Sequence, residues 1–474
     1  DKKVAVVNVP MTFPPEKVKG IMISGMDAPG IDSNFTYPTT LSSELKRVIG
    51  DYSLEAGLWS YISKGEIDLA IQKQHETIEK RFEVTKHLMN HYSWDLFVSV
   101  FTATDRVQHA FWKYMDPRHP LYKPEQAEKF GDAILDVYRK MDHIVGYLLE
   151  HLGEDTVLFI MSDHGAGLCS NKTLYLNNWL CREGLLEYKD FRPNHGPANT
   201  QRLKRLLYTK LLSGLPRDFW KALPRETRDQ VRKRFPSLFN KMASQFFFSR
   251  INMGQTKAYA EESKNFIWIN LKGREPRGTV NPGREYEDIR EQIIHGLLNE
   301  KDPETGEPVL DNVFKREDIY HGDNFEKAPD LVVTFKDLGH VPRPSYTVAP
   351  DVVLRTIPRG ELEQSESSTR ANARHLPNGI LLMRGKGIRA GHKIDGARII
   401  DLAPTILYTM GLPVPTDMDG KVLESAYHEG LLLEKPISHD AVALPSEPAM
   451  QDMVYSPEEE EAIRQRLGDL GYLE

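Results

Sequence analysis

The sequence has two cysteines, no long apolar run and little excess of either charge in its 474 residues. Two cysteines, Cys169 and Cys181, cannot build a disulfide framework and fit a reducing compartment, so the cytoplasm is the expected location; one bridge between them stays open. The longest apolar runs, such as residues 157–161, are far shorter than the roughly 18 residues of a membrane helix, which predicts no transmembrane segment. The net charge of −7 does not indicate nucleic-acid binding by the chain as a whole.

What the sequence does contain is enough apolar material for a large core. Hydrophobic residues make up 40% and charged residues 27%, as in ordinary globular proteins. The length suggests about two or three structural units, or one large α/β core with an insertion. The first residues, 1–7, resemble the approach to a strand rather than a signal peptide or an initiator methionine, so we expect the printed chain to begin inside a longer protein.

One segment departs from the even charge distribution. Residues 201–250 hold 13 basic and three acidic side chains, a net charge of +10, which leaves −17 for the rest of the chain. Such a segment is usually a solvated helical insertion that packs on an acidic body. The alternative is a cap over an active site, where a basic side chain meets an anionic substrate; an acidic membrane surface or a nucleic acid is a further partner for such a stretch.

Two short apolar runs, residues 95–101 and 156–161, predict strands that are buried on both faces of a parallel sheet. Between them, apolar residues recur at the spacing of one helix face. These residues are Ile134, Val137, Met141, Val145 and Leu148. The strand, helix, strand order predicts a βαβ crossover.

Further strands are predicted along the chain, together with a helix from Tyr286 to Leu298. The strand runs are residues 4–9, 21–24, 265–270, 330–335 and 378–383. The predicted class is α/β, with a mostly parallel central sheet flanked by helices and with a helical insertion. The predicted segments are an α/β core in two parts, residues 1–190 and 261–435, a basic helical insertion or cap at 191–260, and a C-terminal tail with an acidic helix at 436–474.

Side chains that can bind metal follow the predicted strands, where ligands collect in open parallel sheets. Asp105 and His109 are four residues apart, which places both on one face of a helical turn. Asp163 and His164 follow the second apolar run, with Gly165 to relax the backbone, and His375 lies in a predicted loop directly before the run at 378–383. Carboxylate oxygens mixed with imidazole nitrogens suit zinc or manganese.

The order of these motifs resembles the alkaline phosphatase superfamily and, within it, the type I phosphodiesterase/nucleotide pyrophosphatase family. The carrying pattern is Asp-x-x-x-His, then Ser-Asp-His-Gly, then a His shortly before a Gly-Ile strand. The resemblance extends from the first strand to Gly420 and does not include the basic segment. Supporting stretches are residues 273–276, 328–331, 401–407, 411–415 and 417–420.

The resemblance implies a hydrolase that cleaves phosphodiester or nucleotide pyrophosphate bonds of small-molecule substrates at two divalent ions, zinc or else manganese. Asp105, His109 and His375 would hold one ion, and Asp163 with His164 would hold part of the second. The family also uses a further Asp ligand and a Thr or Ser nucleophile that forms a covalent phospho-enzyme. We expect both upstream of the printed chain, or on a second polypeptide, so no catalytic nucleophile is named.

Four other classes were weighed against this resemblance. A sulfatase needs a modifiable cysteine in Cys-x-Pro-x-Arg, and neither Cys169 nor Cys181 has that context. A P-loop is unsupported, because residues 385–387 lack its glycine spacing and its Ser or Thr. A phosphoglycerate-mutase-like phosphotransferase and a non-catalytic metal-binding protein both stay open as alternatives.

Overall fold

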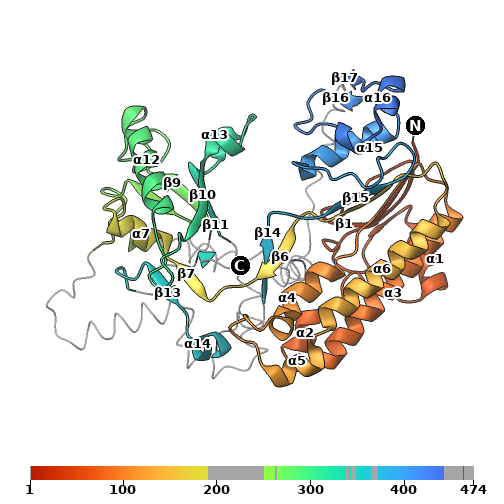
Figure 1. Cartoon of the computed structure of the whole chain (residues 1–474), viewed down its shortest axis with the longest axis horizontal. Coiled ribbons are helices and arrows are strands. Elements are labelled where there is room, and N and C mark those ends of the chain that lie inside the picture. Colours follow the sequence, from red (N-terminus) through yellow and green to blue (C-terminus); the bar gives the residue numbers. More distant parts are fainter. Residues whose placement is uncertain are drawn as a thin grey trace. The chain divides into compact units, whose positions relative to one another are not determined.

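The computed structural model describes residues 2–189, 250–261, 264–336, 341–342, 349–364, 372–441 and 463. The chain forms two compact units, coloured by sequence in Figure 1. Residues 1–169 and 363–474 make the first unit, and residues 170–362 make the second. The second unit is therefore an excursion of the chain that begins and ends in the first.

The largest sheet of the first unit has the strand order β3-β2-β1-β4. The central strand β1 (Val4–Val9) pairs in parallel with β2 (Gly20–Ser24) and β4 (Leu96–Ser99), and β3 (Thr36–Tyr37) pairs antiparallel with β2. Alternate side chains of β1 and β2 point into one core, as the two-residue period of a strand requires. This core includes residues of α1 (Thr40–Ile49) and of α3 (Ile67–His91).

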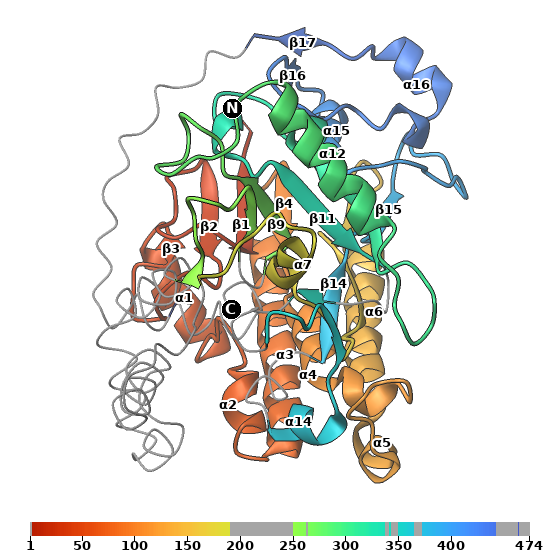
Figure 2. The same ribbon diagram turned by 90° about the vertical axis from the view of Figure 1, so that its left-hand side faces the viewer.

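Three helices of the first unit, α3, α4 (Ala103–Met115) and α6 (Ala133–His151), lie side by side in both overall views (Figure 2). Their facing side chains form a second core with the short helix α2 (Leu58–Ile62), and α5 (Pro124–Phe130) precedes α6. The predicted apolar stripe is part of α6, where Ile134 and Val137 are buried. The helix predicted between the two apolar runs is thus present.

Two antiparallel strand pairs of the first unit lie next to the predicted metal ligands. β5 (Leu158–Met161) pairs with β15 (Leu381–Arg384), and β6 (Gly165–Leu168) pairs with β14 (Ala373–Leu376). The α/β class is therefore right, but the described strands form six separate sheets instead of one central, mostly parallel sheet. β5 does not pair within the sheet of β4, so the predicted βαβ crossover is not formed. A short apolar run predicts a buried strand, but it does not predict which strand will pair with it.

In the C-terminal part of the first unit, the stretches 401–407 and 417–420 stabilise the local backbone. Asp401 is buried, and its carboxylate accepts hydrogen bonds from the backbone N–H groups of Arg398 and Lys421 at 2.9 and 3.0 Å. A Cβ on Gly420 would lie 1.9 Å from the Ile400 carbonyl oxygen, so this close approach requires glycine. The elements here are η4 (Ile399–Asp401), α15 (Leu402–Thr409), β16 (Val414–Pro415), η5 (Glu424–Ala426), α16 (Glu429–Glu434) and β17 (His439–Asp440).

The second unit is built on an antiparallel sheet of order β10-β11-β9-β8. Its apolar core joins this sheet to the helices α7 and α12. The elements are β7 (Lys172–Leu174), α7 (Leu176–Arg182), β8 (Ala258–Ala260), β9 (Phe266–Ile269), α12 (Arg284–Leu298), β10 (Leu310–Lys315), α13 (Arg316–Ile319), η1 (Phe325–Lys327), β11 (Leu331–Phe335), β12 (Val341–Pro342), β13 (Leu354–Thr356) and α14 (Arg359–Gln364), which crosses the boundary between the units.

A buried carboxylate holds the second unit together. Asp330 accepts two hydrogen bonds from the Arg274 guanidinium, at 2.8 and 2.6 Å, and one from the Tyr286 hydroxyl at 2.6 Å. The backbone N–H of Ile269 donates a fourth at 2.6 Å. Both Arg274 and Asp330 belong to stretches that the sequence associates with the family, and their mutual contacts give those stretches a structural role.

The unit boundaries fall at residues 169 and 363, whereas the sequence divides the predicted core at 190 and 261. Most of the predicted insertion at 191–260 lies outside the described residues, as does the predicted acidic helix around 457–461. Both stay predictions. In the ranges that the structure describes, none of the helices combines the length and apolar character that crossing a membrane requires.

Candidate metal centre

Helix α4 presents Asp105 and His109 on one face, one turn apart. Its opposite side is anchored by buried Val107, Ala110 and Phe111. Asp105 lies in the first turn, where the helix dipole favours a negative charge. Asp105 Oδ1 lies 3.3 Å from His109 Nε2, so the four-residue spacing brings the two groups together as the sequence predicts.

The β6–β14 pair supplies the other two histidines. His375 is on β14, opposite Ala166 of β6, and His164 immediately precedes β6. A Cβ on Gly165 would lie 2.3 Å from the Asn378 carbonyl oxygen, so glycine is needed where the two segments cross. The prediction of a loop for His375 is wrong: residues 373–376 form a strand, whose pairing with β6 fixes the position of the imidazole.

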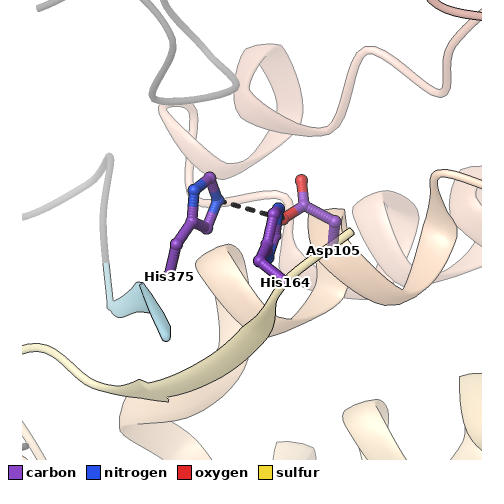
Figure 3. Close-up of side chains that lie close together, drawn as sticks. All are labelled: Asp105, His164 and His375. Carbon is purple, nitrogen blue, oxygen red and sulfur yellow. Dashed lines mark ion pairs between the residues drawn. The ribbon is translucent and has the colours of Figure 1, made fainter. Parts of the chain in front are cut away.

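The donor atoms of these segments converge on one carboxylate oxygen, Asp105 Oδ1 (Figure 3). His375 Nε2 lies 3.3 Å from it, and His164 Nε2 lies 3.9 Å from it. The Nε2 atoms of His109 and His375 are 2.8 Å apart. Ligands of a tetrahedral zinc ion, bonded at about 2.0–2.1 Å, are separated by about 3.3 Å, which is the distance from Asp105 Oδ1 to the Nε2 atoms of both His109 and His375.

Backbone carbonyls orient two of the three imidazoles. His109 Nδ1 lies 2.9 Å from the Ala373 carbonyl oxygen, and His164 Nδ1 lies 3.0 Å from the Gly165 carbonyl oxygen. A carbonyl only accepts hydrogen bonds, so each Nδ1 carries a proton and Nε2 is the ring nitrogen that faces the site. Both rings therefore turn Nε2 toward the carboxylate, which is the orientation of a metal-binding histidine whose Nδ1–H is held by a backbone carbonyl.

The charges around Asp105 keep its carboxyl ionised. Burial would raise the pKa of Asp105, but hydrogen bonds from His109 and His375, together with the positive charge of Arg106, hold this pKa well below its ordinary value. An anionic oxygen beside several imidazole nitrogens is a donor set that a divalent cation can use.

Comparison with known proteins agrees with the sequence resemblance. The family profile described as type I phosphodiesterase / nucleotide pyrophosphatase matches residues 2–347, well over half of the chain. The chain belongs to this family.

Two further comparisons add little to this assignment. Among solved structures, human ectonucleotide pyrophosphatase / phosphodiesterase 5 matches with 13% identity and a TM-score of 0.31, over 73% of this chain and 61% of that one. The chain thus spans about three fifths of that structure. The comparison with curated proteins returns no match.

Within this family member, Asp163 stands apart from the other predicted ligands. Its side chain is 61% exposed, and its Oδ2 lies 3.6 Å from His164 Nε2. In the described ranges, Asp105, His164 and His375 each offer a ligand atom, and these atoms all lie within 4.8 Å of one another. The donor set therefore fits one ion well, and Asp163 with His164 offers only two donors toward a second.

Three residues beside the site were not identified from the sequence. Arg106 and Glu55 form an ion pair next to Asp105, and the buried Asn372 donates hydrogen bonds to the carbonyls of His109 and Ala110 at 3.1 and 2.9 Å. Asn372 thereby joins β14 to α4. In the sequence, Arg106 could have been identified only by its position directly after the predicted ligand Asp105. No sequence pattern indicates Glu55 or Asn372.

Proposed function

We propose that the chain is a metal-dependent hydrolase of phosphodiester or nucleotide pyrophosphate bonds. Asp105, His109 and His375 would hold one divalent ion, zinc or else manganese, and Asp163 with His164 would contribute to a second. One observation carries this proposal. The Nε2 atoms of His109 on α4, His164 directly before β6 and His375 on β14 all lie near the Asp105 carboxylate. Membership of the family supports the reaction class.

The chemistry that such an ion supplies is charge neutralisation at phosphoryl oxygens and activation of an attacking oxygen. The chain's own residues prepare for it in two ways. Asp105 supplies a fixed negative charge, and the carbonyls of Ala373 and Gly165 hold the protons of His109 and His164 at Nδ1. The covalent phospho-enzyme and the cytoplasmic location stay predictions, and no nucleophile is assigned.

The test is hydrolysis of bis(4-nitrophenyl) phosphate and of a dinucleoside polyphosphate by the purified protein, after metal removal and after addition of zinc or manganese. We expect activity that depends on the added ion. Asp105→Ala and His375→Ala should each lose bound metal, measured by elemental analysis, and most of the activity, because each removes a direct ligand.

His151→Ala is the matched control, because His151 also bonds a backbone carbonyl through Nδ1 but lies exposed at the end of α6. It should retain metal and activity. Metal content and rate that do not change in Asp105→Ala and His375→Ala would refute the proposed site. Stoichiometric metal binding without hydrolysis would instead identify a non-catalytic metal-binding protein, and phosphoryl transfer on 3-phosphoglycerate would identify a mutase.

A further inference from the structure

The two oxygens of the Asp105 carboxylate have different neighbours. Oδ1 faces the imidazoles of His109, His164 and His375. Oδ2 accepts a hydrogen bond from Arg106 Nη1 at 2.6 Å. A carboxylate with one oxygen bound to a guanidinium offers the other oxygen alone to a cation.

Arg106 is itself held in place by a group that has no other role in the site. Its Nε lies 3.2 Å from Glu55 Oε2, and its Nη2 lies 3.4 Å from Glu55 Oε1. Glu55 Oε1 also accepts a hydrogen bond from the Thr102 hydroxyl at 3.0 Å, at the start of α4. Arg106 is buried, with 4% of its surface exposed, so the surrounding protein fixes the position of its guanidinium.

We propose that Arg106 is a positioning residue that keeps Asp105 a one-oxygen metal ligand, with Glu55 holding Arg106 in place. The inference rests on the proposed function, since it concerns the same site. With Oδ2 engaged, Asp105 would supply a single ligand atom, Oδ1, alongside the imidazole nitrogens that face it.

Loss of the Arg106 contact would free Oδ2 to bind as a second ligand atom. A two-oxygen carboxylate raises the coordination number and the oxygen share of the donor set, which suits manganese better than zinc. Arg106 should therefore determine metal preference as well as affinity. An ion pair with a purely structural role would affect folding stability and leave the preference between the two metals unchanged.

The experiment compares wild type, Arg106→Met and Glu55→Gln as full-length protein, with zinc and manganese affinities measured by competition with a chromophoric chelator. In Arg106→Met we expect zinc affinity to fall about 10- to 100-fold and manganese affinity to fall less, so that the zinc-to-manganese ratio decreases. Glu55→Gln keeps the shape of its side chain and should shift the ratio in the same direction by a smaller factor.

Cobalt substitution supplies a spectroscopic readout. The visible absorption of bound Co²⁺ weakens as its coordination number rises, so the band of Arg106→Met should be weaker than that of wild type at equal occupancy. Arg118→Met is the control, because the Arg118 guanidinium also binds an aspartate of this helix, Asp116 at its C-terminal end, through two hydrogen bonds. It should change neither the ratio nor the spectrum.

The outcomes separate the two proposals. Wild type that binds neither ion overturns the proposed function, and this inference with it. Wild type that binds zinc, with an unchanged metal ratio and cobalt spectrum in both variants, overturns the inference alone. If circular dichroism shows that Arg106→Met is unfolded, the metal ratio of Glu55→Gln decides.

Discussion

His109 donates its Nδ1 proton to the backbone carbonyl of Ala373, 2.9 Å away and 264 residues further along the chain. This hydrogen bond joins helix α4 to strand β14 at the candidate metal centre. It also sets which nitrogen of the imidazole faces Asp105. The geometry of the site therefore depends on how closely β14 is held against α4.

Asn372→Ala tests that dependence. The side chain of Asn372 donates to the carbonyls of His109 and Ala110, and both bonds are buried. Loss of these two buried side-chain hydrogen bonds should lower the free energy of unfolding by about 1–3 kcal/mol. Urea denaturation measures this change, and zinc affinity should fall as well. The exposed Asn281→Ala is the control, and an equal effect in both variants would contradict this role of Asn372.

Gly165→Ala should disturb the site through the backbone. The added Cβ would meet the Asn378 carbonyl oxygen at 2.3 Å, so β6 and the segment after β14 must separate. We expect lower stability and weaker metal binding, because His164 and His375 lie on these segments. Gly146→Ala in α6 meets nothing within 4 Å and should stabilise the protein by about 0.5–1 kcal/mol. Thermal unfolding with and without zinc distinguishes the two variants.

The lowered pKa of His119 predicts that the free energy of unfolding decreases in mild acid. Burial, followed by the positive charge of Lys113, lowers the pKa of His119 to about 4. In the unfolded chain its pKa is about 6.5, so between these values the unfolded state binds the proton and the native state does not. Stability should therefore fall as the pH decreases from about 6.5 to about 4, by at most about 3 kcal/mol from this residue.

The variant for this prediction is His119→Asn. An amide oxygen can replace Nδ1 of His119 as acceptor for the Leu121 backbone N–H, and it does not titrate. The pH dependence of the unfolding free energy, followed by urea denaturation, should be shallower in the variant across this range. Curves of equal slope for variant and wild type would contradict the prediction.

Asp330→Asn should destabilise the second unit and leave metal binding at the candidate site unchanged. The substitution leaves the Arg274 guanidinium without its anionic partner, and breaking a buried ion pair costs about 3–5 kcal/mol. Asp288→Asn is the control, because its pair with Arg284 is exposed and contributes about 0.5 kcal/mol or less. Zinc content should stay at the wild-type level in both variants. Metal loss in Asp330→Asn would contradict the separation of the two roles.

The sequence was informative wherever a local spacing determines the outcome. The spacing of Asp105 and His109 places both on one helix face, and the apolar stripe that includes Ile134 and Val137 forms α6. The strands β1, β9 and β11 also lie where apolar runs predicted them.

Features that depend on distant partners could not be read from the sequence. β5 pairs with β15, more than 200 residues away, and an apolar run does not specify its neighbour. Glu55 reaches the site through Arg106, 51 residues along the chain, and an isolated Glu carries no motif. His375 lies on a strand and not in the predicted loop, because its pairing partner is β6, about 210 residues earlier in the chain.

The pairing of β6 with β14 brings the exit and the return of the chain to one place. Leu168 and Ala373 are register partners, and the second unit, residues 170–362, is inserted in the chain between them. A long excursion with adjoining ends can be lengthened, shortened or exchanged without altering the two strands that carry it. During divergence, the large inserted part is therefore free to change while His164 and His375 keep their places.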